Sequence, residues 1–109
     1  MLKLYIAVHT DVPDHMVPVV VAHAVLNAHR TFEDNSMYHT WLMSSFKKVV
    51  VRVGHKEFEN IKHRDDVYLG HENNTMNGSK CCAVLLPTYY VPNVFRFAKL
   101  WKPHDRHSD

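Results

Sequence analysis

The chain has 109 residues, enough for one domain with a hydrophobic core and too few for two. Thirteen basic and eleven acidic residues leave a net charge of +2, which by itself neither requires nor excludes a polyanionic partner such as nucleic acid. The ten histidines would add positive charge below neutral pH.

Cysteine content and hydropathy indicate the compartment. Cys81 and Cys82 are the only cysteines, and adjacent cysteines rarely form a strain-free disulfide with each other. No stretch approaches the roughly eighteen apolar residues of a membrane span, and the first residues lack the pattern of a signal peptide. We therefore expect a cytoplasmic protein without a membrane partner, with one domain over residues 1–103 and a frayed polar tail over residues 104–109.

The chain opens with a predicted strand, a loop and a helix. Apolar residues dominate positions 2–8, which suits a central strand covered on both faces. His9, Thr10 and Asp11 then interrupt the apolar run, and from Val17 onward apolar residues recur at helical spacing. Ligands of open α/β sheets bind beyond the carboxyl ends of strands, where helices begin, so we expect the site at this junction.

Six further elements follow. Asn35 or Ser36 is placed to cap a helix, and the strand at 47–53 is the clearest of the later ones because its middle is β-branched. An Asn-rich turn over residues 73–78 joins the last two strands into a hairpin. In chain order, the sequence predicts a helix at 37–45, a strand at 47–53, a helix at 56–64, strands at 67–69 and 81–86, and a helix at 91–101.

These elements predict an α/β fold with three layers, α/β/α, around one four-stranded mixed sheet. Two right-handed crossovers make the first three strands parallel, and the short hairpin makes the fourth antiparallel. The expected strand order is 2-1-4-3. With that order, the hairpin loop over residues 71–80 lies at the same end of the sheet as residues 9–11, so the two loops face each other across one cleft.

Two residues near the first helix each have a chemical and a structural interpretation. Asp11 can orient an attacking water or hold a cationic partner, but a loop aspartate equally makes local turn hydrogen bonds. His23 lies inside the helix, where it either borders the cleft or is satisfied by packing and one hydrogen bond. Both interpretations stay open at this stage.

His71, Glu72 and Cys81 form the most reactive predicted group, because an imidazole beside a thiol can activate a cysteine nucleophile. The alternative is that Cys81, which opens an apolar strand, behaves as a small hydrophobic residue. The histidines show no HExxH and no paired Cys-x-x-Cys spacing, so we expect no metal and no other cofactor.

Basic residues offer a second kind of ligand surface. They can form a phosphate-contacting face, with Tyr89 and Tyr90 as stacking platforms, or a solvated surface interspersed with acidic residues. The residues concerned are Lys47, Lys48, Arg52, Lys56, Lys62, Arg64, Lys80, Arg96, Lys99 and Lys102. Other aromatic residues recur at helical spacing and are expected in the core: Tyr38, Trp41, Phe95, Phe97 and Trp101.

Several of these features together resemble the type II peptidyl-tRNA hydrolases. The shared features are Thr10-Asp11 after the first strand, Ala22-His23-Ala24 in the first helix, Trp41, the strand at 47–53, and Gly78-Ser79 before the last strand. The resemblance covers nearly the whole chain. It implies a three-layer α/β/α domain on a four-stranded mixed sheet that cleaves the ester joining a peptide to tRNA, without a metal.

The resemblance also implies where the site lies, and there the side chains differ from the family pattern. The functional lysine of the family falls at Met16, and its last-strand threonine falls at Cys81. Thr75 keeps the threonine of the family's loop, whereas the loop aspartate is replaced by His71 or displaced to Glu72. A thioether cannot donate a hydrogen bond to a phosphate, so the match is stronger for the fold than for the activity.

We therefore expect a divergent member that hydrolyses or binds a tRNA- or nucleotide-like ligand. The alternative is a catalytically inactive module that sequesters a small nucleotide or contacts a protein, and a homodimer stays open. The expected catalytic residues are Asp11, His71, Glu72, Thr75 and Cys81. The expected ligand-binding residues are His9, Thr10, His15, Met16, His23, Asn74 and Lys80.

Overall fold

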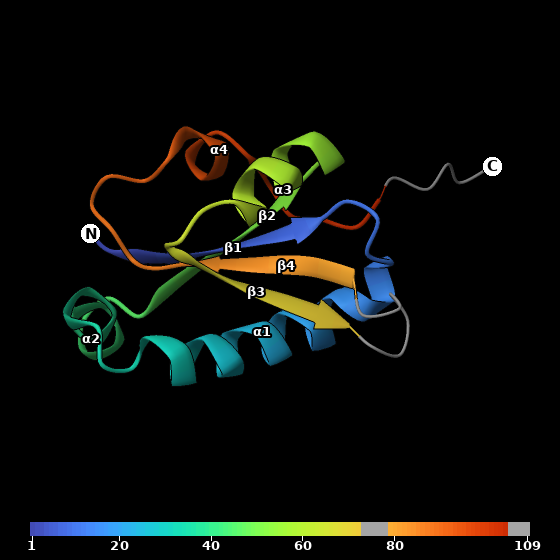
Figure 1. Cartoon of the computed structure of the whole chain (residues 1–109). Helices are drawn as coiled ribbons and strands as arrows, with labels where there is room; N and C mark the ends of the chain where they lie inside the picture. Colours follow the sequence, from blue (N-terminus) through green and yellow to red (C-terminus); the bar gives the residue numbers. More distant parts are fainter. Residues whose placement is uncertain (73–78, 105–109) are drawn as a thin grey trace.

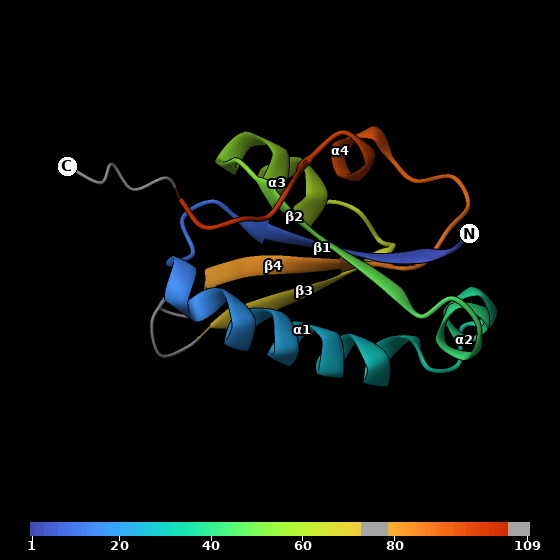
Figure 2. The same ribbon diagram turned by 180° about the vertical axis from the view of Figure 1, so that it is seen from behind.

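The structure, a computed structural model, describes residues 1–72 and 79–104, with only the backbone of His71 and Glu72. One mixed sheet has helices on both faces (Figures 1 and 2). The strands are β1 (Lys3–His9), β2 (Lys47–Val53), β3 (Val67–Glu72), β4 (Ser79–Leu85) and β5 (Lys99–Leu100). The helices are α1 (Val17–Phe32), α2 (Ser36–Met43), α3 (His55–Lys62) and α4 (Asn93–Arg96), and a 3-10 turn, η1 (Asp14–Met16), precedes α1.

β1 lies at the centre of the sheet, as its apolar sequence predicts. β2 pairs with β1 in parallel along its whole length, and β4 pairs antiparallel with the other edge of β1. β3 pairs antiparallel with β4. The strand order is β3-β4-β1-β2-β5, so the predicted order of the first four strands and the predicted direction of the fourth are confirmed.

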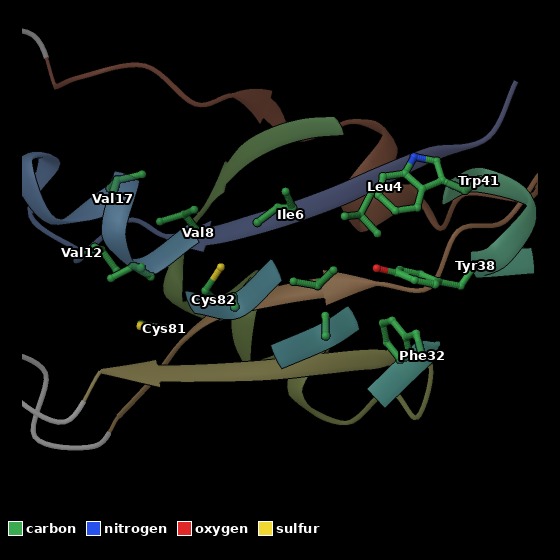
Figure 3. Packing of buried hydrophobic residues seen from close by; sticks show 14 of the residues in the cluster. Leu4, Ile6, Val8, Val12, Val17, Phe32, Tyr38, Trp41, Cys81 and Cys82 are labelled. Atoms are coloured by element: carbon green, nitrogen blue, oxygen red, sulfur yellow. The ribbon is translucent and has the colours of Figure 1, made fainter. Parts of the chain in front are cut away.

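Helices α1 and α2 cover one face of the sheet (Figure 3). The buried residues of α1 recur every three or four positions: Val17, Val20, Ala24, Ala28 and Phe32. They belong to one core with Leu4, Ile6 and Val8 of β1. The Trp41 Nε1–H of α2 donates to the Lys47 carbonyl at 2.8 Å, which ties α2 to the start of β2. Each large buried side chain contributes roughly 1.5–3 kcal/mol to this core.

Helices α3 and α4 cover the opposite face. Phe58 and Ile61 of α3 and Phe95 of α4 are fully buried against Ala7 and Leu85 of the sheet. Their positions follow from the side-chain alternation of β1, in which odd-numbered residues face α3. Within residues 1–72 and 79–104, no helix is long and apolar enough to cross a membrane.

The last predicted helix is wrong over most of its length. A helix was expected at 91–101, whereas α4 ends at Arg96 and β5 adds a fifth strand to the expected four. β5 pairs with β2, and the Trp101 amide donates to the Val50 carbonyl at 2.8 Å. This pairing satisfies backbone groups on the outer edge of β2 that a longer helix would leave open. Phe97, which was expected in the core, is consequently 69% exposed.

The chain beyond β5 is held against the turn before α1. The His104 amide donates to Asp14 Oδ2 at 2.7 Å, and the His104 ring lies 2.7 Å from Asp14 Oδ1. Arg52 of β2 lies 3.6 Å from the same carboxylate and also donates to the Lys102 carbonyl. These contacts, led by the backbone hydrogen bond from His104, hold the pKa of Asp14 below its usual value.

Candidate functional site

A cleft of about 230 Å³ lies where β1 ends and β4 begins, beside α3. It is lined by His9, Asp11, His55, Glu59, Lys62, Ser79 and Lys80. The strand directions place these residues together. Because β4 runs antiparallel to its neighbour β1, the start of β4 lies beside the carboxyl end of β1. The hairpin loop over residues 71–80 was expected to face residues 9–11. Ser79 and Lys80, at the end of that range, do line the cleft with His9 and Asp11, whereas residues 73–78 lie outside the described residues.

His9 is the most buried polar residue of the cleft, at 8% exposed. Its Nδ1 accepts the Asp11 backbone N–H at 3.0 Å, so this nitrogen carries no proton. The proton therefore sits on Nε2, which points at His55 Nδ1 across 3.3 Å. The ring edge also packs on Phe58, with ring centroids 5.3 Å apart. These contacts fix both the tautomer and the orientation of His9.

Charged side chains of α3 lie beyond His55. His55 Nδ1 accepts from His9, so the remaining proton of a neutral His55 is on Nε2, 3.6 Å from Glu59 Oε1. The Lys62 ammonium donates to the same Glu59 oxygen at 3.2 Å. A carboxylate this close to an imidazole can position it as a general base. His55, unlike His9, is 74% exposed and open to a ligand.

Asp11, in the loop after β1, and Lys80, in β4, bring opposite charges to the cleft from positions far apart in sequence. The Asp11 carboxylate is 74% exposed and lies 3.9 Å from His9 Nδ1, which is unprotonated and therefore gives no ion pair. Lys80 is exposed at the start of β4 and makes no ion pair with any residue that the structure describes. Both charged groups are thus available to a ligand.

The sulfur-bearing candidates lie on the other face of the sheet. The register of β4 shifts at its start, because Gly70 is opposite Cys82 but His71 is opposite Lys80. This irregularity places Cys81 in the same core as Cys82, beneath α1, where both are fully buried (Figure 3). Burial, with the adjacent Cys81, raises the pKa of Cys82. Met16 packs against the same core. The structure therefore gives Cys81 the environment of a core residue and not that of a nucleophile.

The remaining expected residues are scattered. The Thr10 amide donates to the Val53 carbonyl at 2.9 Å, and this half-buried residue does not line the cleft. His15 and His23 are exposed on the α1 side of the sheet, so His23 is not satisfied by packing. The backbones of His71 and Glu72 pair with β4, and Asn74 and Thr75 lie outside the described residues.

Sequence reasoning did not place His55, Glu59 or Ser79 at the site, and it named Lys62 only as one of many basic residues of a possible phosphate-contacting face. His55, Glu59 and Lys62 follow one another at steps of four and three, so they share one face of α3. That spacing was visible in the sequence. What the sequence lacked was a reason to bring this face to His9, because α3 was expected only as a short surface helix with a narrow apolar edge.

A second hollow, of about 380 Å³, lies between α3 and α4 and beside β5. Its only ionisable wall residues are Arg52, Glu57 and Lys99, and much of the rest is apolar. Among the described residues, no three histidine, cysteine or acidic side chains are grouped so that they can hold a metal ion. Of these two hollows, only the cleft at His9 is lined by histidine side chains.

No family model matches the chain, and a search of curated proteins found no match. The function has to be argued from the cleft itself.

Proposed function

We propose that the protein binds a phosphate-bearing, nucleotide- or tRNA-like ligand in the cleft at His9. The observation that carries the proposal is the approach of two lysines from different elements, Lys62 of α3 and Lys80 of β4, to one hollow at the carboxyl end of β1. Ammonium groups are strong point-charge partners for phosphate. The natural place for such ligands is the cytoplasm, and we propose that location for the protein.

The kinship with type II peptidyl-tRNA hydrolases, including the three-layer α/β/α arrangement, belongs to this proposal. Its support is the strand order of β1 to β4 and the cleft beyond β1. The positions that carry the family's chemistry do not support it, since Met16 packs against the core and Cys81 is buried. Ligand binding is therefore the main proposal and hydrolysis the second.

Binding is tested by titrating the protein with ADP and with uncharged tRNA at low and high salt. Lys80→Ala should weaken binding about tenfold, because one charge-assisted contact is lost. Lys56→Ala is the matched control, since Lys56 is an exposed lysine of α3 that does not line the cleft. Equal affinity for Lys80→Ala and wild type would remove the cleft as the binding site.

If neither ligand binds at any salt concentration, the result favours the alternative function, a module that contacts a protein partner.

Ester hydrolysis is the second candidate because Glu59 and His55 are arranged as a positioning carboxylate and a base. In this mechanism His55 Nδ1 takes a proton from a water that attacks the ester carbonyl, and returns it to the leaving sugar oxygen. For this step the exposed His55 ring turns away from the buried His9 ring, so that Nδ1 can accept the proton of the water. Release of peptide from peptidyl-tRNA by wild type, and its loss in His55→Ala, would support this candidate. No release at high protein concentration would leave binding alone.

A further inference from the structure

The cleft presents one carboxylate and one ammonium that are not used within the described protein. Glu59 and Lys62 already pair with each other at 3.2 Å, whereas Asp11 has only the neutral His9 ring beside it and Lys80 has no described ion partner. A ligand that only supplies negative charge would satisfy Lys80 and leave Asp11 repelling it. The ligand that fits best therefore carries an anionic group and, a few bonds away, hydrogen-bond donors.

Asp11 is held in place by the backbone and not by its own side chain. Its N–H donates to His9 Nδ1, and the next amide, of Val12, donates to the His9 carbonyl at 3.0 Å. His9 in turn is fixed by Phe58 and His55. The backbone of Asp11 is consequently fixed at the cleft, and its exposed carboxylate keeps both oxygens for hydrogen bonds from a ligand.

The size of the cleft limits how much of a ligand it holds. At about 230 Å³ it is smaller than the roughly 300–1,000 Å³ of pockets that enclose a whole drug-sized molecule. A phosphate with its attached sugar suits this space better than a complete nucleotide. The ribose of a nucleotide offers neighbouring hydroxyl donors, and a carboxylate is the side chain that accepts from ribose hydroxyls in nucleotide-binding proteins.

We propose that the cleft recognises the ribose 5′-phosphate end of a nucleotide, with the phosphate on Lys80 and a ribose hydroxyl on Asp11. The base stays outside the cleft. This inference rests on the proposed function and adds to it the part of the ligand that is recognised. It makes Asp11 a specificity residue and His9 the residue that positions it.

The test compares the affinities of adenosine 5′-monophosphate and its 2′,3′-dideoxy analogue, which differ only in the ribose hydroxyls. Wild type should bind the parent nucleotide about tenfold more tightly, because the analogue leaves Asp11 without a donor. Asp11→Ala should bind the two nucleotides equally, and the isosteric Asp11→Asn should show a reduced preference. Asp34→Ala, which removes an exposed aspartate distant from the cleft, should keep the wild-type preference. Uridine 5′-monophosphate should bind wild type within about threefold of the adenine nucleotide if the base lies outside.

The possible failures are separable. Equal binding of the two adenine nucleotides by wild type, with binding still weakened by Lys80→Ala, would overturn the ribose assignment and leave the proposed function standing. A preference that survives in Asp11→Ala would overturn the role of Asp11. Absence of any nucleotide binding by wild type would overturn the proposed function and this inference together. Thermal unfolding of each variant checks that it is folded, and Asp11→Ala keeps the backbone hydrogen bond to His9.

Discussion

At the scale of single residues, His9 and His55 show how two histidines of one cleft differ in role. His9 is buried, and both of its ring nitrogens are engaged within the protein. His55 is largely exposed, with one nitrogen shared with His9 and the other near Glu59. The sequence placed His9 correctly at the end of a strand, but its partner is 46 positions away. No local spacing predicts such a contact, which depends on how α3 crosses the sheet.

Replacing each histidine by alanine should show that the buried His9 ring stabilises the fold more than the exposed His55 ring does. His9→Ala should lower the free energy of unfolding by about 2 kcal/mol, because a packed ring and two hydrogen bonds are lost. His55→Ala should lower it by about 1 kcal/mol or less, because it breaks only the hydrogen bond to His9 and its own side chain is mostly in water. Denaturant unfolding of both variants measures these values. Equal losses for the two variants would contradict the different roles.

At the scale of elements, the sequence predicted well wherever an apolar pattern was long and belonged to one face. The β1 strand, the α1 helix and the β2 strand all appear close to the expected residues. The segment at 91–101 failed because its apolar residues at steps of three and four suit more than one structure. A four-residue helix still buries Phe95, and pairing with β2 then outweighs the helical pattern over residues 99–100.

The contact of the C-terminal segment with the η1 turn has a defined pH dependence. The pKa of Asp14 is lowered from 3.8 in the folded protein, chiefly by the His104 backbone N–H. A carboxyl with a depressed folded pKa stabilises the fold above its unfolded pKa and loses that contribution as the pH falls through the folded value. Asp14→Asn should therefore unfold at lower urea than wild type at neutral pH, and the two midpoints should converge below about pH 4.

The control for this prediction is His104→Ala. It removes the ring but keeps the backbone N–H, which is the first cause of the lowered Asp14 pKa. It should therefore retain more of the acid-sensitive stability than Asp14→Asn does. The prediction is contradicted if the difference in urea midpoint between Asp14→Asn and wild type is the same at neutral pH and at pH 2. The Asp14 carboxylate would then not be the source of the acid-sensitive stability.

At the scale of the whole molecule, the strand order has two consequences. It places the residues of the cleft together, and without β5 it would leave β2 as an unpaired edge strand. Placing β4 beside β1 puts the start of the hairpin strand next to residues 9–11, because β4 runs antiparallel to β1. The rules for connections between strands say nothing about the outer edge of β2. That edge is closed by β5, whose two residues pair with Val51 and Arg52.

Removing β5 should expose the edge of β2 to other chains. A chain ending at Ala98 loses this pairing, the hydrogen bond from the Trp101 amide to the Val50 carbonyl, and the contacts of His104 with Asp14. It should be less stable by about 2 kcal/mol or more, and an open edge strand should make it self-associate as concentration rises. A chain ending at His104 keeps all of these contacts and is the matched control.

Size-exclusion chromatography across a concentration series reports the association. Identical elution of the two shortened chains would mean that β5 does not protect the edge of β2 from association. The role of β5 would then be to position His104 for its contacts with Asp14.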